Sequence, residues 1–447
     1  MKKLIIFSVL LISYLISGLY AQTTEEIKKN TTPLVIPVGE AKPDKIKLFF
    51  VPFVPVNAEK GLSKDAGEMF KIIKNDFSFY VHSVETVEDK KSSDFIISFN
   101  EVKFEANNRE LKAKIYSQES KKEVYTKIFK FSNNRLSKDS HFVANSLYRE
   151  VFKKKSIFNS KIFFISDRQS TKLKRIKELY WMDFDGRHME RLTDLKSIVI
   201  SPDVRKDNKK VLFSSYGEKS YINKHGKKGV LKNLNLYEID MDTRKVRLIS
   251  DRDGLNSGAI YSHNPNFIYI TLTIRKNADI YRMNINTKEI TPVTRHTADD
   301  VDPSIIPTGD QMAMLSSRPG SSHIYTLDPN TLETNVKRIS FAGKYNSFPR
   351  YSPNSQFIIF SSWRDAGFDI FRLDAKTGKN LVRLTKNFGS NEEANFALDS
   401  EFIVFTSQRY LGPGRVTQDI YLINTEGEII RRISDRLGVI TSPRFSK

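Results

Sequence analysis

Short runs of alternating apolar and polar residues recur down the second half of the chain. Each run opens with a polar residue, continues with Leu or Ile and an aromatic residue, and closes with Asp or Asn. Alternation at period two predicts half-buried strands, and a repeat of about 40 to 45 residues is typical of β-propeller blades with four strands each. The six runs start at intervals of 44 to 57 residues and are Glu178–Asp183, Asn235–Asp240, Asp279–Asn284, His323–Asp328, Asp369–Asp374 and Asp419–Asn424.

The flanks of each run complete a blade. An apolar stretch such as Phe357–Ser362 precedes it, and a stretch ending in Arg-Leu-Thr, such as Arg383–Thr385, follows it. Six such sets predict six blades over residues 161–447. The first set lacks an inner segment, and Thr441–Lys447 resembles the missing one. We therefore expect the C-terminal strand to complete the first blade and close the ring, because closure removes unpaired sheet edges.

The preceding residues 45–157 show a different pattern, which is typical of a small α+β domain. Two stretches carry apolar residues at helical spacing, one from about Ser63 and one from about Ser137. Alternating or continuous apolar runs predict strands at Ile46–Phe53, Phe79–Val87, Asp94–Phe104, Leu111–Tyr116 and Val124–Phe131. The predicted fold is thus mixed, with an N-terminal α/β (α+β) domain at 45–157, then an all-β six-bladed β-propeller at 161–447 closed by the C-terminal strand.

The first 44 residues fit neither domain. Residues 1–21 combine Lys2 and Lys3, an apolar stretch and a closing Ala21, the order found in a cleavable secretory signal peptide. Residues 22–44 are polar and proline-containing, and we expect a flexible segment. Within it Leu34, Val35 and Ile36 are suited to docking as an extended strand on another sheet. A disordered leader is the alternative.

Composition narrows the possible partners. The chain has no cysteine, so the exported protein has no disulfides, and its formal net charge is +20. The lysines are scattered through all segments rather than lining one aromatic groove, which argues against nucleic acid as a partner. One basic insertion, at about Gly217–Lys232, accounts for the longest interval between runs. It is either an exposed loop or a contact to an anionic polymer.

No motif of an enzyme is present. The sequence has no His-Glu-x-x-His helix, no Gly-x-Ser-x-Gly elbow and no Walker A or dinucleotide motif. We therefore predict no catalytic residues, no metal and no cofactor. The stretch Asp183–Gly186 matches half of a calcium loop, but it falls where the other blades have a hairpin turn, and we predict a turn.

Polar residues gather in the segments that precede the inner strands. In a propeller these segments meet around one mouth of the central channel, where they can receive a peptide or a protein loop. Solvated turns and a cation site in the channel are the alternatives. The predicted partner-binding residues are Asp251, Asp253, Asn256, His296, Asp299, Asp300, Tyr345, Asn346, Asn391, Glu392 and Glu393.

The chain resembles the TolB family of periplasmic proteins in the Tol–Pal cell-envelope system. The resemblance rests on Phe50–Phe53, on the junction Val151–Ser166 and on repeats of the type Ser352–Thr385. It implies a monomeric, non-enzymatic periplasmic adaptor, peripheral to the membrane at most, that supports outer-membrane integrity, cell division and protein import. The propeller mouth would bind a Pal-like peptidoglycan-associated lipoprotein, and the N-terminal segment would engage a TolA-like inner-membrane protein.

Two other functions remain open from the sequence. A lyase or hydrolase working in the propeller channel would need a histidine beside carboxylates, and only His296 with Asp299 and Asp300 comes near. A surface-exposed propeller that binds a glycan or a host protein is the other. The inner segments at 304–307 and 395–399 depart from the repeat, as do the basic insertion and the proline-rich leader.

Overall fold

The computed structural model describes residues 44–52, 62–105, 108–222, 226, 228–412 and 416–446. The predicted signal peptide and the docking segment Leu34–Ile36 lie outside them. Two compact units are distinguished, residues 1–42 and residues 43–447, and only the second contains described residues. No helix in the described ranges has the length and apolar character needed to cross a membrane.

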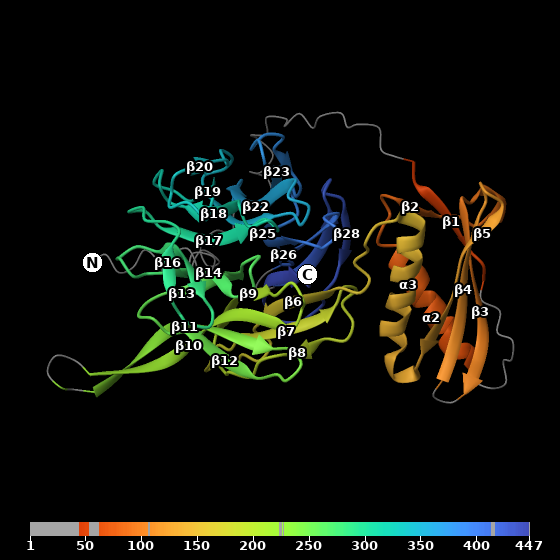
Figure 1. Ribbon diagram of the computed structural model, residues 1–447, viewed down its shortest axis with the longest axis horizontal. Coiled ribbons are helices and arrows are strands. Elements are labelled where there is room, and N and C mark those ends of the chain that lie inside the picture. Colours follow the sequence, from red (N-terminus) through yellow and green to blue (C-terminus); the bar gives the residue numbers. More distant parts are fainter. Residues whose placement is uncertain are drawn as a thin grey trace. The chain divides into compact units, whose positions relative to one another are not determined.

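The N-terminal domain is a five-stranded sheet with two helices on one face (Figure 1). The strands lie in the order β2-β1-β3-β4-β5, with β1 parallel to both neighbours and the other pairs antiparallel. The elements in chain order are β1 (Ile46–Phe50), α2 (Leu62–Phe77), β2 (Val84–Thr86), β3 (Phe95–Glu105), β4 (Asn108–Ser117), β5 (Lys122–Phe131) and α3 (Leu136–Phe152), with short 3-10 turns at Lys90–Ser92 and Asn133–Arg135.

Apolar spacing explains how the helices pack on the sheet. Met69, Ile73 and Phe77 of α2 repeat every four residues, so they form one buried stripe against the strands. Both predicted helices are present. The predicted strand Phe79–Val87 is largely wrong, because only Val84–Thr86 pairs with β1. Phe79 lies instead in a turn and is buried against Phe184 of the propeller, with ring centroids 4.9 Å apart.

The remaining chain forms six four-stranded antiparallel sheets, which confirms the predicted propeller. Five blades are built from consecutive strands, innermost first. Blade 2 holds β9 (Val199–Val204), β10 (Lys210–Ile222), β11 (Lys228–Asp240) and β12 (Val246–Ser250); blade 3 holds β13 (Asn256–Tyr261), β14 (Phe267–Leu272), β15 (Asp279–Asn284) and β16 (Ile290–Pro292); blade 4 holds β17 (Asp300–Ile305), β18 (Met312–Ser316), β19 (His323–Leu327) and β20 (Lys337–Arg338); blade 5 holds β21 (Asn346–Tyr351), β22 (Phe357–Arg364), β23 (Gly367–Asp374) and β24 (Val382–Arg383); blade 6 holds β25 (Ser390–Phe396), β26 (Phe402–Tyr410), β27 (Val416–Asn424) and β28 (Ile429–Arg432).

The C-terminal strand closes the ring, as predicted. Blade 1 consists of β29 (Ile440–Phe445), β6 (Lys161–Ser166), β7 (Glu178–Asp183) and β8 (Glu190–Arg191) in that order. β29 pairs antiparallel with β6 from Ile440 opposite Ser166 to Phe445 opposite Ile162. The inner strands contact one another around the whole circle, and β29 lies between β25 and β9.

The aromatic runs are the third strands of the blades, and their first residues join neighbouring blades. These residues are buried although they are polar. Asp369 of blade 5, for example, accepts hydrogen bonds from Thr385 at 2.8 Å and from Asn391 of blade 6 at 3.1 Å. A buried polar group needs such partners, so the hydrogen bonds tie the third strand, the outer strand and the next inner strand together.

Candidate functional site

A bulge shared by all six inner strands shapes the channel. The third residue of each bulge segment has a left-handed backbone, with φ between 53° and 59°. Each bulge interrupts the pairing with the second strand, so every inner strand turns its next residues toward the axis. The six residues are Ser201, Gly258, Asp302, Phe348, Glu393 and Ser442.

Four of the predicted mouth residues are built into the junctions between blades. Asn256, Asp300, Asn346 and Asn391 each stand at or next to the start of an inner strand and are at most 1% exposed. The Asn346 amide, for instance, donates to the Nδ1 of His323 at 3.0 Å and to Ser340 at 2.8 Å. Their side chains are thus engaged in holding the blades together.

The other predicted mouth residues lie nearer to solvent. Asp251 and Asp253 are exposed, whereas His296, Asp299 and Tyr345 are half-buried. The His296 Nδ1 accepts the backbone N–H of Ala298 at 3.0 Å, and the Asp299 carboxylate accepts that of Ala278 at 2.8 Å. Tyr345 stacks on Trp363 with ring centroids 5.6 Å apart. These contacts give the mouth an ordered polar lining.

Glu392 and Glu393 place two carboxyl groups side by side at the mouth. Glu393 accepts hydrogen bonds from the backbone and the hydroxyl of Ser442 on the neighbouring inner strand, the latter at 3.2 Å. Burial, and next the charge of Glu393, raise the pKa of Glu392 to about 8. The shift favours the neutral form of the Glu392 carboxyl group.

The channel itself contains a small polar cavity of about 110 Å³. Arg350 donates to Asp302 at 2.8 Å across it. Burial, and next the charge of Arg350, lower the pKa of Arg444 to about 10. Two guanidinium groups oppose a cation in this cavity, and the volume is too small for a peptide.

None of the described residues that line the cavity is a histidine. The channel thus brings together carboxylates and guanidinium groups, but not the His–carboxylate pair that the lyase or hydrolase alternative requires.

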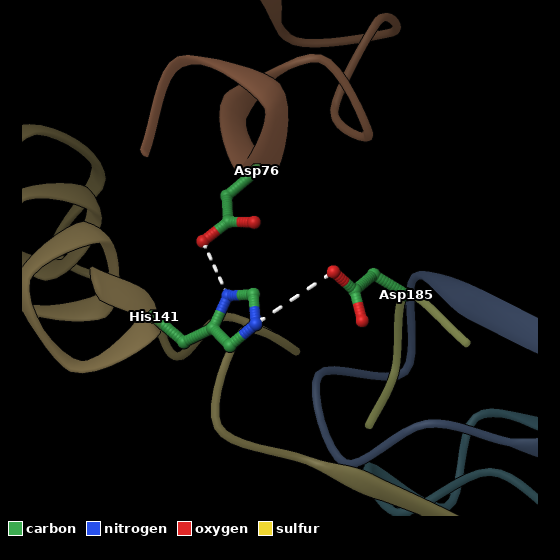
Figure 2. A group of neighbouring side chains, drawn as sticks. All are labelled: Asp76, His141 and Asp185. Atoms are coloured by element: carbon green, nitrogen blue, oxygen red, sulfur yellow. Dashed lines mark hydrogen bonds and ion pairs between the residues drawn. The ribbon is translucent and has the colours of Figure 1, made fainter. Parts of the chain in front are cut away.

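A second polar cluster lies where the N-terminal domain meets blade 1 (Figure 2). His141 of α3 is 3% exposed. Its Nδ1 lies 2.8 Å from Oδ2 of Asp76 in α2, and its Nε2 lies 3.7 Å from Oδ2 of Asp185 in the turn between β7 and β8. Ser137 lies 3.1 Å from the same Nε2. The sequence prediction of a turn at Asp183–Gly186 is compatible with this role, but the contact with His141 was missed.

The buried charges of this cluster shift the pKa values of His141 and Asp76. The pKa of His141 is raised: burial opposes its charged form, but the hydrogen bond and charge of Asp76 outweigh that effect. Burial raises the pKa of Asp76 to about 6 against the lowering effect of His141. The raised pKa favours an imidazolium facing the Asp76 carboxyl group, and Arg187 lies 3.2 Å from Asp185.

The same three side chains have the ligand types and spacing of a possible metal site. Their ligand atoms all lie within 4.8 Å of one another, and histidine with carboxylates suits a divalent transition metal. Both nitrogens of His141 already have partners, however, and Arg187 and Arg431 bring positive charge to the carboxylates. The arrangement fits a proton on the imidazole better than a metal.

Further contacts join the N-terminal domain to blades 6 and 1. Tyr80 donates to Asp399 at 2.8 Å, and Glu401 contacts both His82 and Lys154 at 3.1 Å. The guanidinium of Arg431 lies 3.8 Å from the ring centroid of Phe79. All the propeller residues involved belong to the connections on the face opposite the mouth or to the outer strand of blade 6.

The fold defines a two-domain class, a small mixed α/β domain followed by a closed six-bladed propeller. Residues 148–381 match the family described as the TolB beta propeller domain. Because this match covers more than half of the chain, the protein belongs to the TolB propeller family.

Similarity to individual proteins supports the same family assignment. The chain is 26% identical over 230 residues to a Protein TolB homolog of Chlorobium luteolum, covering 52% of this chain and 48% of that protein. It is 26% identical over 160 residues to the Tol-Pal system protein TolB of Rickettsia felis, covering 36% and 32%. The chain thus spans about half or less of the length of these relatives. The crystal structure of TolB from Acinetobacter baumannii has the same fold, with a TM-score of 0.71 at 17% identity over 91% of this chain and 98% of that one.

Proposed function

We propose that this protein is a non-enzymatic periplasmic adaptor of the Tol–Pal system. Its propeller mouth binds a Pal-like lipoprotein, and its N-terminal segment around Leu34–Ile36 engages an inner-membrane Tol partner. The observation that carries the proposal is the match of the propeller to the TolB family, together with the shared fold of both domains. In this role the protein supports outer-membrane integrity and cell division.

The mouth supports a binding role because its central groups are polar, ordered and reachable. The channel below it holds only a small cavity crossed by the Arg350–Asp302 pair, so a partner segment rests on the rim rather than threading the ring. Exposed Asp251 and Asp253, with Glu393, offer carboxylates to donors of a partner loop. Preordered lining groups lower the entropy cost of binding.

Calorimetric titration with the soluble domain of a Pal-like lipoprotein from the same organism tests the proposal. Charge reversal at two exposed positions, Asp251→Lys with Asp253→Lys, should weaken binding about tenfold, because rim charges set complementarity. The matched control is Asp242→Lys, an exposed carboxylate in the β11–β12 turn on the opposite face. Absence of binding by the unaltered protein, or equal binding by the rim variant, would overturn the proposal. Asp300 is unsuitable for this test, since it is buried against Arg318.

A further inference from the structure

The mouth face of the propeller presents more large exposed apolar side chains than the opposite face does. Adjacent strands of a blade run antiparallel, so the hairpins between second and third strands lie on the same face as the loops that lead to the next inner strand. Of the fifteen large exposed hydrophobic side chains among the described residues of the propeller, ten lie in these connections or in the strand ends that lead into them. The ten are Leu173, Leu195, Tyr221, Val230, Leu231, Ile274, Phe341, Tyr410, Leu411 and Val416. The other five are Leu332, Leu381 and Leu398 in the connections of the opposite face and Val246 and Leu248 in β12.

Cations flank the apolar tips in four of the blades. Leu173 of blade 1 is 99% exposed and stands between Lys172 and Lys174. Ile274 of blade 3 is followed directly by Arg275 and Lys276, which are also exposed. Two tips thus combine a free aliphatic side chain with at least two positive charges.

The other two tips, in blades 2 and 6, belong to longer hairpins and also place exposed apolar side chains next to basic residues. The hairpin of β10 and β11 stays paired to Ile222 opposite Lys228 and extends beyond its blade (Figure 1). It exposes Val230 and Leu231 before Lys232. In blade 6, Tyr410 and Leu411 follow the exposed Arg409 and are 68% and 54% exposed.

These four blades are consecutive around the ring. Their inner strands contact one another in the order β25, β29, β9 and β13, which places the tips of blades 6, 1, 2 and 3 along one arc of the mouth. We call the exposed apolar and basic residues of these four hairpins the tip surface. The N-terminal domain contacts the opposite face, through Asp399, Glu401 and Asp185, and leaves the tip surface uncovered.

We propose that the tip surface binds the headgroup region of an anionic phospholipid bilayer. The apolar side chains stand on separate hairpins, so they form no continuous groove for a protein helix or strand. Separate aliphatic and aromatic side chains suit shallow insertion between lipid headgroups, while the neighbouring lysines and arginines attract lipid phosphates. The contact would hold the propeller mouth beside a membrane surface without a membrane-spanning segment. The proposal does not depend on a protein partner at the mouth.

Vesicle flotation tests the proposal. The full-length protein without its predicted signal peptide, which would itself insert, is mixed with vesicles of phosphatidylethanolamine and phosphatidylglycerol or of phosphatidylcholine alone. We expect binding to the anionic vesicles that weakens as salt is added. The double variant Leu173→Ser with Ile274→Ser should bind about tenfold more weakly, because each change removes an inserting side chain. Leu332→Ser, an exposed leucine on the opposite face, is the matched control and should bind as the unaltered protein does.

A charge variant separates insertion from simple attraction. Lys172→Glu with Lys174→Glu should also reduce binding. If the charge variant loses binding while the Leu173 and Ile274 variant does not, the surface recognises a soluble or polymeric anion and the bilayer proposal is overturned. Equal binding to both vesicle types by every variant, or no binding, overturns it as well. Calorimetry with a Pal-like domain should be unchanged in the Leu173 and Ile274 variant, which distinguishes failure of this proposal from failure of the adaptor function.

Discussion

The residue that opens the third strand of each blade determines the chemistry of one blade junction. In blade 5 it is Asp369, which faces the amide of Asn391. In blade 3 it is Asp279, and the residue at the start of the next inner strand is Asp300, a second carboxyl group. Among the described residues, Oδ2 of Asp279 and Oδ1 of Asp300 are buried without a hydrogen-bond partner, whereas at the junction of blades 5 and 6 only Oδ1 of Asn391 is. The junction between blades 3 and 4 therefore leaves more buried polar atoms without hydrogen bonds than the junction between blades 5 and 6.

Replacing Asp279 by Asn should stabilise the protein at neutral pH. Burial, and next the charge of Asp300, raise the pKa of Asp279 to about 6. A raised carboxyl pKa means that the folded state holds the proton more tightly than the unfolded chain, so the carboxyl costs stability above about pH 6 and the cost disappears as pH falls toward 4. We expect Asp279→Asn to raise the free energy of unfolding by about 1 kcal/mol at pH 7.5.

Urea denaturation at several pH values checks this prediction. The gain of Asp279→Asn should shrink as pH falls below about 5, where the wild-type carboxyl is protonated. Asp369→Asn serves as the comparison, because it removes an acceptor that already faces Arg383, Thr385 and Asn391, and it should destabilise. A destabilised Asp279→Asn protein at pH 7.5 would contradict the argument.

His141 makes the stability of the domain junction depend on pH in a defined direction. Its pKa is raised in the folded protein, so its contribution is complete below the unfolded value and is lost as pH rises through the folded value. His141→Gln leaves the buried Asp76 carboxylate without its charged partner, and we expect a loss of about 3 kcal/mol near pH 6.5. The difference from wild type should narrow as pH rises through the raised folded pKa of His141.

Thermal unfolding of wild type and His141→Gln over this pH range gives the measurement. His188→Gln is the control, since His188 also pairs with a carboxylate, at 2.7 Å from Asp183, but its side chain is 59% exposed. An exposed pair contributes little, so this variant should follow the wild-type profile. A difference between His141→Gln and wild type that does not change with pH would refute the role of the proton.

At the scale of elements, the closing strand β29 decides whether the propeller is a ring. It supplies the inner edge of blade 1, and Phe445 and Ile440 are buried in the same core as the N-terminal domain. Deleting residues 440–447 exposes the edge of β6 and opens the ring. We expect loss of cooperative thermal unfolding, measured by circular dichroism, with aggregation through the free edge. Removing Lys447 alone is the control and should leave the melting temperature unchanged. An unchanged melting temperature after the longer deletion would show that closure is dispensable.

The elements were largely predictable because each depends on local periodicity. Third strands such as Asp369–Asp374 alternate in a way that a single sequence shows, and the surplus inner segment at the C-terminus follows from counting the repeats. The error at Phe79–Val87 has a physical cause. Phe79 is apolar because it packs on Phe184 from the other domain, not because it belongs to a strand.

The sites were less predictable, because they depend on contacts across long separations. The sequence predicted Asn346 and Asn391 as binding groups at the mouth. It does not reveal that each side-chain amide donates a hydrogen bond to the third strand of the preceding blade. The proximity of Asp76, His141 and Asp185 is set by the packing of two domains. The only local signal was that every third strand opens with a polar residue where an apolar one would suit a buried position.

At the scale of the whole molecule, the N-terminal domain and the propeller share one hydrophobic core. The cluster that contains Leu48 and Leu147 of the N-terminal domain also contains Phe164 of blade 1 and Phe402 of blade 6. Phe184 of the propeller packs against the N-terminal domain within this shared core. Its ring centroid lies 4.9 Å from that of Phe79 and 5.7 Å from that of Phe158. A core shared in this way should make the two domains unfold together, since neither can expose its face of the junction without exposing the other.

Removing Phe184 tests that coupling. Phe184 is fully buried, and Phe184→Ala creates a cavity between the domains that should cost about 3 to 5 kcal/mol. In scanning calorimetry the wild type should show one transition over residues 43–447, whereas the variant should show two. Phe360→Ala, an equally buried site inside the core of blades 4 and 5, is the matched control. It should lower the transition temperature without splitting it, because its cavity weakens one domain and not the contact between them. A single transition in Phe184→Ala would mean that the polar contacts of Tyr80, His82 and His141 are enough to couple the domains.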